Sequence, residues 1–274
     1  MSAAATPAIR TQLEAALALR AVGRLQDALD ALVTPGEYSS DFYTIRGEIQ
    51  VALGRFQEAA GSYFTVVTSE PENAFAQFNL AVCLQQLGRW SEASLAFQKV
   101  LQVDPHRDDA RLALGACLLH MNRPEEALTN FDKCWSDASR TRALFGKAVS
   151  LQLLGRQDEA ESHYQRLLLS DSKPEEILSN LVALSIEAWD LEAIQHYASR
   201  LLEVAPNSVT ALQGLAAVAL ERREYEAAVR YCGRIVERAP DCVEAWHNLR
   251  FASGRVMSAL HPSESGGPSF TGRT

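Results

Sequence analysis

Apolar residues recur every three or four positions along most of the chain, and the pattern is clearest between residues 72 and 105. In the first half of this stretch, Leu80, Leu84 and Leu87 fall on one face of a predicted helix. Gly88 follows directly, and glycine ends helices because it takes the left-handed conformation without steric cost. The first half is therefore predicted to be an amphipathic helix that stops at a tight turn.

The second half of the stretch repeats the same spacing at Leu95 or Ala96, Val100 and Val103. Ser91 is the predicted N-cap of this second helix, since its hydroxyl can accept a hydrogen bond from a free N–H of the first turn. Pro105 is predicted to end the helix because proline lacks the N–H that a further turn requires. The whole stretch is thus predicted to be a helical hairpin.

The same hairpin pattern returns along the chain at intervals close to 34 residues. Small or β-branched residues mark the expected crossing point of the two helices, and glycines and prolines mark the turn and the end. In the second helices these residues are Ala28, Ala59, Ala93, Ala127, Ala160, Ile194 and Ala228, and in the first helices Ala16, Gly47, Ala81, Gly115, Ala148, Val182 and Ala216. The turn glycines are Gly23, Gly54, Gly88 and Gly155, and the closing prolines are Pro71, Pro105, Pro206 and Pro240. A single hairpin cannot bury its apolar face, so the repetition predicts stacked hairpins.

This repeat resembles the tetratricopeptide repeat (TPR), a helix–turn–helix unit of 34 residues. A large apolar residue also opens the second helix, as in that family, at Leu25, Phe56, Trp90, Leu191 and Tyr225. The resemblance implies an all-α protein: a right-handed α-solenoid of about seven repeats followed by a C-terminal capping helix.

The expected organisation has three parts: an N-terminal tail over residues 1–8, a TPR superhelix over 9–257 and a disordered tail over 258–274. The disordered tail is expected from its serine, glycine and proline content; a linker, a docking peptide and an inert tail are all open. The repeats are expected near residues 9–34, 40–71, 74–105, 108–137, 141–171, 175–206 and 209–240, with the capping helix at 243–257.

Three repeats depart from the pattern. The first is short, because Thr34, Pro35 and Gly36 interrupt its second helix. The fourth has Asn122 at the turn, where asparagine tolerates the same left-handed backbone. The sixth has Trp189 at the turn and Ile194 in the alanine position, which predicts locally distorted packing.

The acidic balance of the chain argues against two classes of partner. Lysine and arginine number 26, and aspartate and glutamate 34, which gives a formal net charge of −8. A nucleic-acid-binding protein would show a basic stripe, and an anionic membrane surface would also require positive charge. We therefore expect no nucleic acid and no membrane insertion, the longest apolar stretch being too short to span a bilayer.

Cysteine usage and the N-terminus point to the cytoplasm. The five cysteines are odd in number and have no metal-ligand spacing, so free thiols in a reducing compartment are expected; a disulfide between Cys232 and Cys242 is the alternative. Arg10 and Glu14 interrupt any apolar segment of a signal peptide.

The sequence contains none of the motifs of phosphate-binding loops, dinucleotide folds, zinc proteases or serine hydrolases. The six histidines lie in different repeats without a second metal ligand nearby, although register places His120 on the inner surface. Asp108–Asp109 and Glu125–Glu126 fall in first turns of helices, where they complement the helix dipole. We expect no catalytic residues, no metal and no cofactor.

The TPR resemblance implies a concave groove lined by the first helix of each repeat, and register assigns the residues that would contact a partner. These are Phe75, Phe78, Asn79, Val82, Leu112, Leu119, Arg142, Phe145 and Val149. Phe75, Phe78, Leu112 and Phe145 are the expected anchors, because buried aromatic and large apolar residues dominate interface energies. Asn79 is expected to hydrogen-bond a ligand backbone. The alternatives are that the chain's own tail fills the groove, or that Phe75 packs under the preceding loop.

These features predict a non-enzymatic scaffold or adaptor that binds a peptide or helix of an unknown protein partner. Self-association and a role as regulatory subunit of a secretion, pilus or glycosyltransferase-type complex are the alternatives. A heat-shock co-chaperone is not expected, because Arg142 is a lone cation among Asp41, Glu48 and Asp109.

Overall fold

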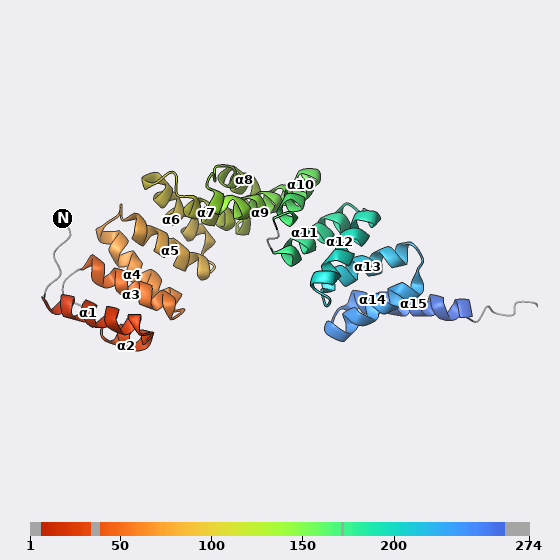
Figure 1. The fold of residues 1–274 in the computed structure, drawn as a ribbon, viewed down its shortest axis with the longest axis horizontal. Coiled ribbons are helices and arrows are strands. Elements are labelled where there is room, and N and C mark those ends of the chain that lie inside the picture. The colour runs from red at the N-terminus through yellow and green to blue at the C-terminus, as the bar shows by residue number, and fades with distance from the viewer. Residues whose placement is uncertain (1–6, 34–38, 171–172, 261–274) are drawn as a thin grey trace, which may run out of the picture. The chain divides into compact units, whose positions relative to one another are not determined.

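The computed structural model describes residues 7–33, 39–170 and 173–260, and over these residues the chain forms helices and no strands (Figure 1). The all-α prediction is confirmed. The helices are α1 (Pro7–Ala21), α2 (Leu25–Asp30), α3 (Ser40–Ala52), α4 (Phe56–Ser69), α5 (Ala74–Gln86), α6 (Trp90–Val103), α7 (Asp108–His120), α8 (Pro124–Asp132), α9 (Asp137–Leu153), α10 (Gln157–Leu168), α11 (Pro174–Glu187), α12 (Leu191–Val204), α13 (Val209–Glu221), α14 (Tyr225–Arg238) and α15 (Val243–Leu260).

The helices belong to two compact units, divided after Arg156. Unit 1 holds α1 to α9, and unit 2 holds α10 to α15. Within each unit, helices consecutive in the chain pack on one another as hairpins, such as α5 with α6 and α13 with α14. A single superhelix running from residue 9 to residue 257 stays a prediction.

The turn of each hairpin is built by one residue with a left-handed backbone. Gly88 has φ of 71°, and the next N–H, that of Arg89, donates to the carbonyl of Leu84 at 2.9 Å. The N-cap predicted for α6 is wrong: the helix begins at Trp90, so Ser91 lies inside the first turn and Arg89 is the N-cap residue. Arg89 instead forms an ion pair with Glu92 one turn later, and the same pairing recurs in α4 and α8 as Arg55–Glu58 and Arg123–Glu126.

Three turns without glycine take the same conformation. Asn122, Trp189 and Arg223 have φ of 55°, 54° and 61°. In the sixth hairpin the N–H of Asp190 donates to Ser185 at 3.0 Å, which reproduces the bond made after Gly88, and Ile194 is fully buried. The structure therefore retains this hairpin where distortion was expected.

The small residues at the helix crossings lie in the core, where neighbouring aromatic rings need the space. A Cβ atom added to Gly47 would lie 2.8 Å from the ring of Tyr63. Phe131, on α8, uses two such positions: an added Cβ would lie 2.6 Å from its ring at Gly115 on α7 and 2.5 Å from it at Gly146 on α9. One aromatic ring thus packs against glycines of two successive first helices.

Helix α8 ends early, and a buried carboxylate compensates for the lost turn. The helix stops at Asp132 after 9 residues, whereas α4 and α6 have 14. Unwinding leaves backbone N–H groups without helical partners. Oδ2 of Asp108 accepts hydrogen bonds from the N–H of Trp135 (3.2 Å), the N–H of Ser136 (2.8 Å) and the hydroxyl of Ser139 (2.8 Å). Asp108 therefore has a second role beside the helix-dipole role expected from the sequence: it accepts the hydrogen bonds of the segment that follows α8.

The ends of the chain differ slightly from the expected boundaries. Helix α1 begins at Pro7, and α15 continues to Leu260, three residues beyond the predicted cap. The short first repeat is confirmed, since α2 has 6 residues. The interruption predicted at residues 34–36 and most of the predicted C-terminal tail, residues 261–274, lie outside the described residues. In the part of the chain that is described, no helix is long and apolar enough to cross a membrane.

Candidate partner-binding face

The first helices α5, α7 and α9 of unit 1 form one layer. Helix α7 contacts both α5 and α9 directly, whereas α4, α6 and α8 each contact mainly the first helices beside them. We call the side of α5, α7 and α9 that carries the register-assigned residues the inner face, and the layer formed by α4, α6 and α8 the outer layer. All nine predicted site residues lie on α5, α7 and α9.

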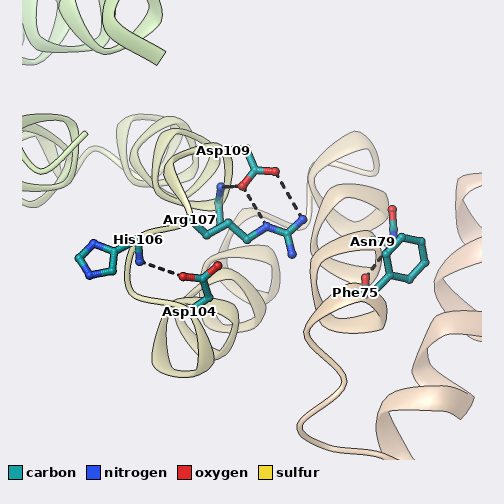
Figure 2. Close-up of polar contacts among 7 residues, drawn as sticks. Phe75, Asn79, Asp104, His106, Arg107 and Asp109 are labelled. Carbon is teal, nitrogen blue, oxygen red and sulfur yellow. Dashed lines mark hydrogen bonds and ion pairs between the residues drawn. The ribbon is translucent and has the colours of Figure 1, made fainter. Parts of the chain in front are cut away.

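Helix α5 presents an aromatic side chain to solvent in its first turn. Its N-cap is Asn73, whose side chain accepts from the N–H of Ala76 at 3.0 Å. Phe75 follows two residues later and is 47% exposed. One turn further on, Nδ2 of Asn79 donates to the carbonyl of Phe75 at 2.9 Å (Figure 2). One N–H of the Asn79 amide is thus bonded within its own helix.

Phe78 is half-buried and covered by groups that sequence reasoning missed. Its ring packs edge-on against Phe97, with centroids 5.7 Å apart. Cζ of Arg107 lies 4.1 Å from the Phe78 ring centroid, and Asp109 holds that guanidinium through an Nε–Oδ1 contact of 3.0 Å (Figure 2). The Arg107 side chain comes from the loop before α7, so helix register could not assign it; the nearby opposite charge of Asp109 was the available signal.

The remaining apolar residues of the predicted site fall into two groups. Val82, Leu119, Phe145 and Val149 are half-buried. Leu112, an expected anchor, is only 7% exposed and belongs to a core cluster of unit 1 that spans Ala59 to Ala143. Leu112 occupies the same register position as Phe78, but on α7 the side chain at this position packs into the core. We therefore exclude Leu112 from the binding face.

Ion pairs within the chain neutralise much of the charge expected around this face. Arg20 of α1 pairs with Glu48, and Arg107 pairs with Asp109. Asp41 and Arg142 are exposed. The face therefore combines the exposed Phe75 with half-buried apolar side chains, and two arginines lie on or beside it, Arg107 over Phe78 and the exposed Arg142.

The other groups considered from the sequence have packing roles. The ring of His120 stacks on Trp90, with centroids 4.0 Å apart and planes within 6°. Cys83 and Cys117 are buried, and burial raises the pKa of both thiols to about 11, so they are unreactive near neutral pH. No group of three or more metal-ligating side chains occurs among the residues that the structure describes.

Comparison with known families gives a match in two overlapping segments. Residues 52–134 and 87–167 match the model for subunit 3 of the anaphase-promoting complex (cyclosome). No curated protein matches the sequence. The matched segments contain all of α5, α7 and α9, and thus the residues of the inner face.

Solved structures with the same fold cover most of the chain. A tetratricopeptide repeat protein from Parabacteroides merdae aligns over 90% of this chain and 100% of its own, with a TM-score of 0.65 and 17% identity. PilW, a type IV pilus biogenesis factor, aligns over 78% of this chain and 98% of its own, with a TM-score of 0.64 and 20% identity. The complex of Cut9 and Hcn1 from the anaphase-promoting complex contains a chain that aligns over 86% of this chain and 48% of its own, with a TM-score of 0.59 and 16% identity. At these identities the likeness establishes the fold.

Proposed function

We propose, from the premise that this chain is a tetratricopeptide-repeat protein, that it is a non-catalytic scaffold whose inner face in unit 1 binds a segment of another protein. The partner segment carries apolar side chains and is either an extended peptide or a helix. Phe75, Phe78, Asn79, Val82, Leu119, Arg142, Phe145 and Val149 are the residues proposed to contact it.

The exposure of Phe75 is the observation that carries this proposal. Its position in the first turn of α5 places the ring in solvent at 47% exposure. The core of the same hairpin is already filled by Leu80, Leu84 and Phe97, all buried, so folding does not require an aromatic residue there. Large apolar side chains gathered on one face commonly mark a protein-interaction site.

The similar proteins support a role within a multi-protein assembly, but they do not identify the partner. The matched family model and the Cut9–Hcn1 structure come from one large multi-subunit assembly, and PilW takes part in pilus biogenesis. By analogy, we propose that this chain acts as an adaptor within a larger complex. A cytoplasmic location is proposed from the five cysteines, which are all free in the structure.

Self-association is a second candidate, favoured by the C-terminal helix. Val243, Trp246, Phe251, Met257 and Leu260 on α15 are all about half or more exposed. A mass that rises with protein concentration in light scattering would indicate this role.

Replacing Phe75 by aspartate is expected to weaken partner binding about 30-fold, or about 2 kcal/mol, as for the loss of an interface hot spot. The fold should persist, because an acidic residue in the first turn of a helix is favoured by the helix dipole. The measurement is quantitative mass spectrometry of proteins that co-purify with each variant, followed by titration of the proteins identified.

The matched control is Leu169→Asp, which replaces an apolar side chain that is 88% exposed in unit 2. This variant should retain the partners of the wild-type protein. Equal recovery of the same proteins by wild type and Phe75→Asp would rule out the inner face as the binding site.

A further inference from the structure

A hollow of about 470 Å³ lies in the outer layer of unit 1, between the second helices α4 and α6. One wall includes Gly61 and Phe64 of α4, the other includes Leu95 of α6, and Leu80 and Leu84 of α5 contribute to its lining. Phe64 and Leu95 are 62% and 59% exposed. We call this hollow the outer groove. It is distinct from the inner face, because α5 turns different side chains to each.

The repeats provide an internal comparison for this surface. Gly61 and Leu95 each stand two residues after the crossing residue of their helix. At the same position in the later second helices the chain has exposed polar residues, which are Thr129, Ser162, His196 and Arg230. Three residues further on, where α4 has Phe64, the helices α6, α8, α10 and α12 have Gln98, Asp132, Gln165 and Ser199. The repeat fold therefore does not require an apolar outward surface, and α4 and α6 carry one.

Gly61 adds a second observation. It lies in the middle of α4, where glycine lowers helix stability relative to alanine. A Cβ atom added to Gly61 would meet no other atom within 4 Å, and its φ is not in the left-handed region. Neither packing nor backbone conformation accounts for this glycine. Its effect is to keep the outer groove open for close approach by another molecule.

The chemistry of the groove selects the kind of partner. Its walls are the sides of helices, whose backbone N–H and C=O groups are already paired, so an extended peptide would leave its own backbone unpaired in an apolar groove. A helical partner segment has no such cost, because its backbone N–H and C=O groups are paired within the helix. From Gln57 to Val67 the α4 wall has a length of about 15 Å at 1.5 Å per residue, which suits two to three helical turns.

The charged residues at the rim of the outer groove further restrict the kind of partner that fits it. Among the polar residues that line the groove, Arg89 and Glu92 are hydrogen-bonded to each other. Lys99 also lines the groove, and no ion pair of Lys99 with another described residue is present in the structure. An acidic side chain on the partner would complement this lysine.

We propose that the outer groove is a second docking site, and that its occupant is an amphipathic helix of a protein partner with an apolar stripe flanked by acidic residues. Because this site and the inner face use different sides of α5, both can be filled at once. The protein would then bridge two partners.

The test uses two display libraries of 15-residue helical peptides with variable apolar stripes, one with glutamate flanks and the other with lysine flanks. Each is selected against the full-length protein, and the enriched peptides are titrated by fluorescence anisotropy. We expect enrichment from the glutamate library, affinity at least tenfold lower for Gly61→Gln, and at least tenfold weaker binding when a central proline breaks the peptide helix. Lys99→Glu should shift the preference toward lysine-flanked peptides.

The matched control is Gly233→Gln on α14, another helical glycine with no atom within 4 Å of an added Cβ; it should change affinity less than twofold. Both glutamine variants should keep the thermal midpoint of the wild type or raise it. Absence of enrichment, or binding that is indifferent to Gly61→Gln, would overturn the proposal. A concentration-dependent dimer that Gly61→Gln dissociates would also overturn it, because a second copy would then be the occupant.

Discussion

Replacing Asp108 by alanine is expected to lower the free energy of unfolding by about 3 kcal/mol at pH 7, because a buried carboxylate that accepts several hydrogen bonds is lost. The side chain is buried, and its Oδ2 binds the two N–H groups and the hydroxyl that follow the shortened α8. Without it, Trp135 and Ser136 have no acceptor for N–H groups that an uninterrupted helix would have paired. Chemical denaturation of both proteins measures the difference.

The same site should make stability depend on pH. Burial of Asp108 raises the pKa of its carboxyl group, but the hydrogen bonds from Ser136, Ser139 and Trp135 outweigh that effect, so the pKa lies below its usual value. A folded-state pKa below the unfolded value means that the stabilisation is fully present above about pH 4, the ordinary range for aspartate. It is lost as the pH falls through the lower folded-state pKa.

The difference in unfolding free energy between wild type and Asp108→Ala should therefore narrow on acidification to pH 3 and below. Asp109→Ala is the matched control: Asp109 is the neighbouring, exposed aspartate, whose carboxylate contacts Arg107 and the N–H of Ala110. Its loss should cost less than about 1 kcal/mol, as for other exposed ion pairs. An Asp108→Ala protein as stable as the Asp109→Ala protein would contradict this account.

Replacing Gly146 by valine is expected to destabilise the protein by about 3 kcal/mol through overpacking. Even the first added carbon would lie 2.5 Å from Cζ of Phe131. The ring is buried and the same edge also packs against Gly115, which limits how far it can move aside. The consequence would be separation of α8 from α9, within the part of unit 1 that carries Phe145 and Val149.

A double-mutant cycle tests whether contact with the Phe131 ring causes this loss of stability. The smaller side chain in Phe131→Leu should reduce the cost of Gly146→Ala, so that the two substitutions together cost less than the sum of their separate effects. Gly233→Ala serves as the control, because a Cβ there meets no atom within 4 Å; it should be neutral or stabilise by up to about 1 kcal/mol. Strict additivity of Gly146→Ala and Phe131→Leu would contradict the packing explanation.

The spacing of small residues was sufficient to predict the hairpins because it reflects a local geometric need. Two helices cross closely only where side chains are small, and Ala81 and Ala93 are both fully buried in the structure. The turn positions with glycine were also predictable, because the left-handed backbone of a turn is another local requirement, which glycine meets without steric cost. At Trp189 the residue type suggested distortion, yet the surrounding hairpin imposes the left-handed backbone on it, so tertiary packing outweighs the local preference.

The binding face was less predictable, because exposure depends on neighbours that lie far apart in the sequence. Register correctly placed Phe75 on an exposed side of α5, but it gave Leu112 the same surface role as Phe78. Leu112 is in the core, and Phe78 is covered by Arg107 from a loop 29 residues away in the chain. The shortened α8 appeared in the sequence only as a step of 33 residues between Ala127 and Ala160. This step does not indicate that the buried carboxylate of Asp108 would accept the hydrogen bonds of the lost helical turn.

Site-specific photo-crosslinking from position 75 tests the central claim most directly. Benzoylphenylalanine in place of Phe75 resembles the native side chain and reacts only with groups in contact. We predict discrete crosslinked products with another protein in cells, and none of these products when the same group replaces Leu169. Crosslinks from position 75 that reach only this chain itself, or an identical set of products from both positions, would contradict the proposal that the inner face binds a partner.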